Sequence, residues 1–151
     1  MVAGGSLSMR TYLFRARFEP GDERGVVVTF PDLPEAITQG DDDADARAMA
    51  EEVLGLALLA RLRRGEPLPE PKARGGDLVE IGVTPTVAAK LAVVEAFRAS
   101  GLTQAELAAR LGKDPREVRR ILDPNHATKL PALDAALKAM GRRLVMGVMA
   151  A

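Results

Sequence analysis

Residues 25–71 read GVVVTFPDLPEAITQGDDDADARAMAEEVLGLALLARLRRGEPLPEP and contain the strongest structural signals of the chain. The β-branched run from Val26 to Phe30 predicts a buried strand. Pro31 and Pro34 then end it, because each proline removes a backbone donor and restricts the residue before it to extended conformations. A short strand from Ala36 to Gln39 follows before Gly40. The stretch therefore predicts two strands joined by a rigid corner.

A long helix follows these strands. The aspartates of residues 41–43 are candidate N-caps, and their charge complements the positive end of a helix that begins near Ala44. Apolar side chains recur at helical spacing, and the arginines of residues 61–64 suit the negative end of the helix dipole. The apolar positions are Met49, Val53, Leu56, Ala57 and Ala60. Gly65 is expected to end the helix.

The flanking segments complete a small sheet. Thr11 to Phe18 has strand composition, and the turn from Glu19 to Gly25 predicts a hairpin with Val26 to Phe30. After a Pro- and Gly-rich connection over residues 66–76, the apolar alternation from Asp77 to Val83 predicts a fourth strand. We therefore expect a β-β-β-α-β domain over residues 9–83, with the helix on one face of its sheet. Residues 1–8 are expected to form a disordered leader.

Helical signals alone dominate residues 84–151, so the chain is expected to be α+β with two domains. Two of the helix starts are strongly marked: Thr103 and Glu106 form a capping box, and Asp114 precedes Pro115 as N-cap and N1. The predicted helices cover residues 87–99, residues 104–111, a stretch from Pro115 that ends before Pro124, and about residues 131–140. The apolar run from Arg143 to Val148 predicts a last short strand.

Charge divides the chain in the same place. The 151 residues carry 21 basic and 21 acidic side chains, but residues 1–83 hold 10 basic and 15 acidic ones, whereas residues 84–151 hold 11 and 6. This asymmetry indicates two domains with different partners. The absence of cysteine excludes disulfide scaffolds and thiol nucleophiles. No apolar run is long enough to cross a bilayer, and we expect a cytoplasmic protein without a membrane partner.

The two capped helices around Gly112 predict a helix-turn-helix, whose second helix enters the major groove of DNA. If that helix buries Val118, Ile121 and Leu122, its arginines are left to contact bases, and nearby lysines suit phosphates. The predicted DNA-binding residues are Gln104, Lys113, Arg116, Arg119, Arg120 and Lys129. The alternative is a helical hairpin with a solvated charged face.

Residues 87–144 resemble the lambda-repressor-like helix-turn-helix family, and TQAELAARLG, residues 103–112, is the specific part. The chain departs from that family at Pro115, which lies early in the recognition helix and can make no base contact. Lys113 is a second departure, because a small apolar residue is more common there.

The residues do not indicate an enzyme. Metal-dependent hydrolysis needs carboxylates that converge from a sheet, and the first strand, TYLFRARF, has none. A contiguous run such as residues 41–43 is a solvated cap more often than a cation site. Phosphate-binding glycine loops and GxSxG motifs are absent from the sequence. We therefore expect no catalytic residues, no metal and no cofactor, although a ribonuclease-H-type enzyme is the rival that cleavage assays would test.

The sheet half resembles the HicB antitoxin family of type II toxin–antitoxin systems. The resemblance covers residues 12–83 and rests on a strand ending in FPDLP, a TxG turn, an Ala- and acid-rich helix and the trailing GEPLPEP. The chain departs from the pattern at Glu35, where glycine is usual, and at Val26 and Val27, where an aromatic residue often follows Gly25.

The resemblance implies a partial ribonuclease-H-like fold without catalytic carboxylates and a basic, mRNA-cleaving toxin of the HicA type as partner. An acidic domain attracts such a toxin electrostatically. The expected toxin contacts are Phe30, Pro31, Asp32, Leu33, Glu35, Asp41 and Asp42, although the FPDLP corner also suits a purely structural turn. The resemblance further implies that the helical half binds operator DNA and represses its own operon.

One helix-turn-helix reads about half an operator, so a homodimer or a higher even-numbered oligomer is expected, with residues 143–148 as one candidate contact. The alternative function is a stand-alone regulator whose sheet domain senses a small ligand. A short basic toxin gene beside this one would favour the antitoxin.

Overall fold

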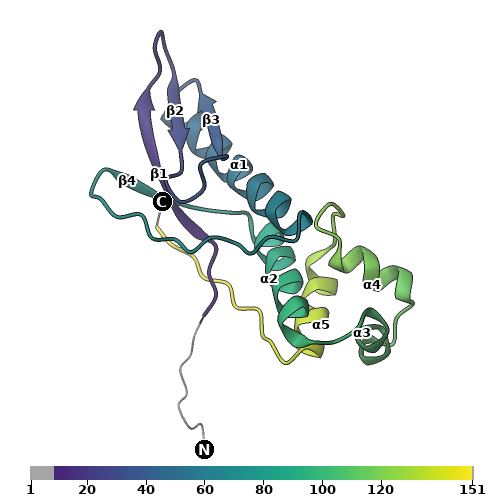
Figure 1. Cartoon of the computed structure of the whole chain (residues 1–151). Coiled ribbons are helices and arrows are strands. Elements are labelled where there is room, and N and C mark those ends of the chain that lie inside the picture. The colour runs from purple at the N-terminus through teal and green to yellow at the C-terminus, as the bar shows by residue number, and fades with distance from the viewer. Residues whose placement is uncertain (1–8, 151) are drawn as a thin grey trace, which may run out of the picture.

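The computed structural model describes residues 9–150, so the leader predicted for residues 1–8 lies outside the described residues. The α+β class is confirmed: an antiparallel sheet with one long helix is followed by four shorter helices (Figure 1). None of the helices within residues 9–150 combines the length and apolar character that a membrane span requires.

The sheet has four antiparallel strands in the order β3-β2-β1-β4. They are β1 (Leu13–Pro20), β2 (Val26–Thr29), β3 (Ile37–Gly40) and β4 (Leu78–Gly82). The chain turns between β1 and β2 at residues 21–25, whereas β4 pairs with the other side of β1. Phe18 lies opposite Val28, and Phe14 lies opposite Ile81. The predicted β-β-β-α-β order is confirmed.

Helix α1 (Asp43–Arg63) covers one face of this sheet. Asp42 is its N-cap, and the carboxylate of Asp42 accepts a hydrogen bond from the backbone N–H of Asp45 at 2.8 Å. Buried apolar side chains from the sheet meet those of the helix. These are Phe14, Ala16, Val28 and Phe30 from the sheet side and Ala46, Ala50, Leu54 and Leu58 from α1. Burial of this apolar face holds helix and sheet together.

The remaining helices are α2 (Pro85–Ser100), α3 (Gln104–Leu111), α4 (Pro115–Leu122) and α5 (Leu130–Ala139). Helix α2 belongs to both halves of the molecule: Leu91 and Val94 pack into the sheet core, whereas Ala89 and Val93 pack against α4 and α5. It begins at Pro85, two residues before the predicted start, because proline fits the first helical turn.

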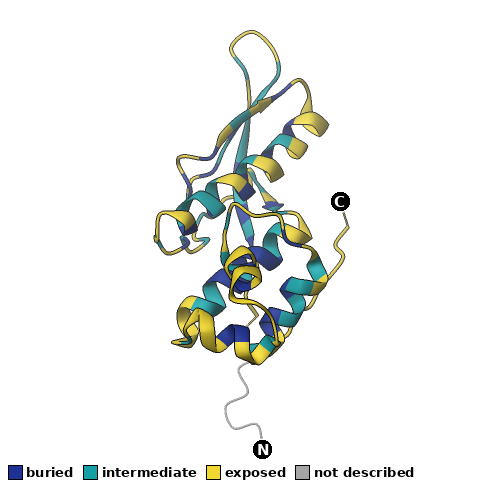
Figure 2. Ribbon diagram, turned by 90° about the vertical axis from the view of Figure 1, so that its right-hand side faces the viewer, coloured by how far each residue is buried: buried dark blue, intermediate teal, exposed yellow. Residues whose placement is uncertain are grey.

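The strand predicted from Arg143 to Val148 is not formed. This segment leaves α5 through Gly141 and runs without regular structure; Val148 is fully exposed and Val145 and Met146 are mostly exposed (Figure 2). The strand pattern is present in the sequence, but a strand needs a neighbour to pair with its backbone. Within the described residues this segment has no such neighbour.

Candidate partner-binding and nucleic-acid interfaces

Helices α3 and α4 form a compact pair closed by a three-residue turn. Thr103 and Glu106 form the predicted capping box, in which each side chain accepts a backbone N–H of the other residue. Gly112 ends α3 in the left-handed conformation, with φ of 61°, which glycine adopts without strain. Asp114 then caps α4 by accepting from the backbone N–H of Arg116 at 2.7 Å. These local signals fix where both helices begin.

Helix α4 has two chemically different faces. Val118 and Ile121 are buried against the other helices. Arg116 and Arg120, one turn apart, lie on the opposite, exposed face. Among the described residues neither arginine forms an ion pair. Both guanidinium groups are therefore free to meet an anion from outside the chain.

The other predicted DNA-binding residues are also exposed and border the same helix pair. Gln104 is the first residue of α3, Lys113 lies in the turn, Arg119 lies on α4 and Lys129 is the N-cap of α5. Figure 2 looks onto the side of the molecule that carries these helices and shows exposed residues along it. The structure thus places the predicted DNA-binding residues around the α3–α4 pair, within the helical half.

Lys90 joins α2 to the end of α4. The side chain is almost fully buried, and its Nζ donates to the backbone carbonyls of Arg120 and Ile121, at 3.1 and 2.8 Å, and to Oγ1 of Thr128 at 2.7 Å. The last carbonyls of a helix have no partner within it and carry partial negative charge, so the ammonium stabilises the end of α4. Burial lowers the pKa of Lys90 to about 8, opposed by the charge of Asp123.

The lowered pKa of Lys90 predicts that stability rises with pH. Between the ordinary value of 10.5 and about 8, the unfolded chain holds a proton that the folded chain has released. This contribution is therefore complete above pH 10.5 and is lost as the pH falls to about 8. We expect the free energy of unfolding to gain about 2 kcal/mol from pH 8 to pH 10 relative to Lys90→Met, measured by urea denaturation. Exposed Lys138→Met is the control, and equal slopes in wild type and Lys90→Met would contradict the expectation.

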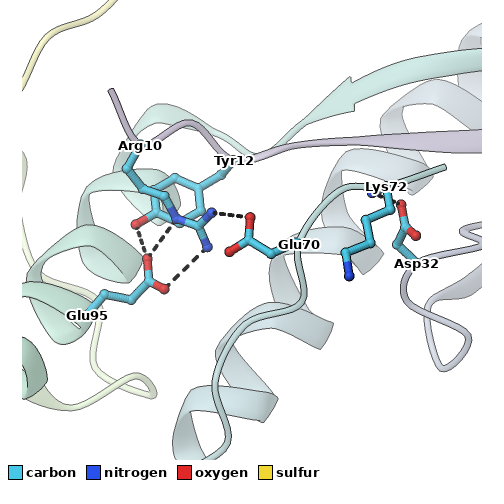
Figure 3. Close-up of polar contacts among 6 residues, drawn as sticks. All are labelled: Arg10, Tyr12, Asp32, Glu70, Lys72 and Glu95. Carbon is cyan, nitrogen blue, oxygen red and sulfur yellow. Dashed lines mark hydrogen bonds and ion pairs between the residues drawn. The ribbon is translucent and has the colours of Figure 1, made fainter. Parts of the chain in front are cut away.

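The FPDLP corner is built from the core outward. Phe30 and Leu33 are fully buried, so within this fold they support the corner from beneath, and Pro31 is exposed. The carboxylate of Asp32 accepts the backbone N–H groups of Lys72 and Ala73 at 2.9 and 2.8 Å (Figure 3). Asp32 therefore holds the Pro-rich connection of residues 66–76 against the corner.

Glu35 forms a two-pronged ion pair with Arg61 of α1. The distances from its carboxylate oxygens to Nε and Nη2 of Arg61 are 2.6 and 3.0 Å. This pairing holds the pKa of Glu35 below its usual value. The corner is thus anchored to the C-terminal end of α1.

The acidic cluster lies at the other end of α1. Asp42 caps the helix, and the carboxylate of Asp45 accepts from the backbone N–H of Asp41 at 2.8 Å. Within residues 9–150 the carboxylates of Asp41 and Asp43 accept no hydrogen bond, and both are exposed. At 1.5 Å per residue the two ends of α1, a helix of 21 residues, are roughly 30 Å apart. The predicted toxin contacts therefore form two groups, and a partner that reaches both must extend along α1.

A second polar junction fixes α2 against the start of β1. Figure 3 shows Arg10 between Glu70 and Glu95, with the Tyr12 hydroxyl pointing to Glu95. Arg10 Nε donates to Glu95 at 3.2 Å, and the Tyr12 hydroxyl donates to the same carboxylate at 2.5 Å. Burial and this contact raise the pKa of Tyr12. The junction and Lys90 together attach α2 to both halves.

Groups of three or more His, Asp or Glu side chains that would hold a metal are not found among residues 9–150. Two open hollows lie on the surface of the described residues: one of about 500 Å³ at the β1–β2 turn, and an apolar one of about 230 Å³ between α1 and the start of α2.

The acidic sheet half and the basic helical half thus share one helix, α2, which packs into the cores of both. The model of the HicB-like antitoxins of bacterial toxin–antitoxin systems matches residues 12–92, and the chain belongs to this family. It is 37% identical over 151 residues to antitoxin HicB 1 of Photorhabdus laumondii, covering 97% of this chain and 96% of that protein.

Further relatives agree with this assignment. Antitoxin HicB of Escherichia coli K12 is 39% identical over 127 residues, which cover 83% of this chain and 91% of the relative. Antitoxin HicB of Pseudomonas fluorescens is 30% identical over 145 residues, covering 95% and 97%. The similarity thus extends beyond the sheet half into the helical half.

Proposed function

We propose that this chain is the antitoxin of a two-gene toxin–antitoxin pair with two separate tasks. Residues 9–83 bind and mask a HicA-type, mRNA-cleaving ribonuclease toxin, and residues 84–151 bind operator DNA as a dimer and repress the operon. The protein acts in the cytoplasm, without catalysis and without a cofactor. The observation that carries this proposal is the match of the antitoxin family model over the acidic sheet half.

The charge of the sheet half supports a basic partner. Asp41 and Asp43 are exposed at the start of α1, and within residues 9–150 their carboxylates accept no hydrogen bond. Rim charges of this kind mainly speed association, because they steer a partner of opposite charge. A toxin with an RNA-binding surface is such a partner.

The α3–α4 pair supports the DNA-binding task. We assign it as a helix-turn-helix with α4 as recognition helix, because its exposed face presents Arg116 and Arg120 without an internal counter-ion. The exposed apolar segment of residues 143–148 is the proposed dimer contact, since a second copy would cover Val145, Met146 and Val148.

The product of the gene beside this one, which the proposal expects to be a short basic toxin, provides the direct test. We expect the purified chain to co-purify with that toxin and to stop its cleavage of RNA at equimolar ratio. Asp41→Asn/Asp43→Asn should slow association about tenfold at low salt, because two steering charges are lost while the Asp42 cap remains. The matched control is Asp22→Asn/Glu23→Gln at the β1–β2 turn, which removes the same charge elsewhere. A chain that neither binds the toxin nor protects RNA overturns the proposal.

A further inference from the structure

Three arginines at the C-terminal end of α1 differ in how their charge is compensated. Arg61 pairs with Glu35, and Arg64 pairs with Glu66. Arg63 is exposed and forms no ion pair with any carboxylate of residues 9–150. Its Nη1 donates instead to Oδ1 of Asn125 at 2.7 Å. Arg63 of the sheet half thus contacts the neutral side-chain amide of Asn125 in the helical half and has no acidic partner there.

The contact places Arg63 beside the end of α4. Asn125 lies three residues beyond α4, and its backbone N–H donates to Asp123 Oδ1 at 2.9 Å, which fixes the turn. Figure 1 shows the C-terminal end of α1 next to the loop that leaves α4. The loop between α4 and α5 also contains the exposed Lys129. Asp123 is the single acidic residue of this loop.

The length of α4 relates this position to a DNA groove. Eight helical residues extend about 12 Å, which equals the width of the major groove. The N-terminal residues of a recognition helix contact base edges, so we expect the far end of a helix of this length to lie near a strand that borders the groove. A cation beside that end is within reach of phosphates. Arg63 uses one of its five N–H donors on Asn125, so four remain for phosphate oxygens.

We propose that Arg63 of α1 contacts the phosphate backbone of duplex DNA when α4 occupies the major groove. The toxin-binding half then contributes directly to the nucleic-acid interface. The inference rests on the proposed DNA binding and adds a contact from outside residues 84–151. A phosphate contact carries no sequence information, so it strengthens binding to any duplex equally.

The test measures how the affinity of the full chain depends on salt. The probes are a 30-bp duplex from the region upstream of the gene and a scrambled duplex of equal length. Loss of one phosphate contact reduces the magnitude of the slope of log affinity against log salt by about 0.9. At 0.1 M monovalent salt this change corresponds to about eightfold weaker binding. We expect Arg63→Gln to show both changes on both duplexes.

Two variants separate a phosphate contact from a structural one. Arg47→Gln removes a charge from the distant half of α1 and should change neither slope nor affinity. Asn125→Ala removes the acceptor of Arg63 and leaves its charge, so its salt slope should equal that of wild type. If Arg63→Gln binds DNA with the affinity and salt slope of wild type, this inference alone is overturned. It is also overturned if Arg63→Gln and Asn125→Ala weaken binding equally and both keep the wild-type salt slope. A wild-type chain that binds neither duplex overturns the proposed DNA binding itself.

Discussion

Replacement of Arg116 and Arg120 together by alanine should weaken specific operator binding about a hundredfold or more and leave toxin inhibition unchanged. A bidentate contact between arginine and guanine contributes about 1–3 kcal/mol to base discrimination, and the double variant removes two candidates for it. Both side chains lie on the exposed face of α4, opposite Val118 and Ile121. Their loss therefore removes recognition without opening the core.

The fold should tolerate this change. Alanine is the best helix former, and the cap from Asp114 goes to a backbone N–H, which the substitution at Arg116 retains. Fluorescence anisotropy with operator and scrambled duplexes measures the loss of specificity, and RNA cleavage by the toxin measures the retained function. Operator affinity equal to that of wild type would show that α4 is not the recognition helix.

A matched control distinguishes lost base contacts from lost charge. Arg24→Ala/Arg47→Ala also removes two exposed arginines, both in the sheet half and both without ion pairs among the described residues. We expect that variant to keep its preference for the operator. Equal weakening by the two double variants would mean that the charge of the chain, and not the face of α4, determines affinity.

Local signals in the sequence were sufficient to predict the element order. Caps and breakers act within a few residues of the chain, and Asp42, Thr103, Gly112 and Asp114 lie where helices begin or end in the structure. The prediction for residues 143–148 was wrong because strand formation depends on a neighbouring strand, which no local pattern supplies.

The functional surfaces were harder to predict because they depend on contacts between distant residues. The sequence shows Glu35 and Arg61 as separate charges, yet the fold pairs them and leaves Arg63 uncompensated. Phe30 belongs to the same short motif as Pro31, but Phe30 packs into the core directly after β2, whereas Pro31 lies in the exposed turn that follows. Lys90 lies among apolar residues in the sequence, which favours burial of its side chain. Its acceptors on α4 become apparent only in three dimensions.

Gly40→Ala should be among the most destabilising single substitutions in the sheet half. A Cβ at this position would lie 2.3 Å from the backbone N and 2.5 Å from the Cα of Ala46, in the first turn of α1. Both atoms belong to backbone that moves only if the helix moves. We expect a loss of about 3 kcal/mol in the free energy of unfolding, measured by urea denaturation. Toxin inhibition should weaken as well, because displacement of α1 moves Asp41 and Asp43.

Gly76→Ala is the matched control, since no atom lies within 4 Å of a Cβ at Gly76. Replacement of glycine by alanine also restricts the unfolded chain and by itself favours folding by about 0.4–1 kcal/mol. Because both variants share this effect, the difference between them isolates the clash at the start of α1. Equal stability of the two variants would show that α1 can shift away from β3 at little cost. The close approach would then not be what requires glycine at position 40, the last residue of β3.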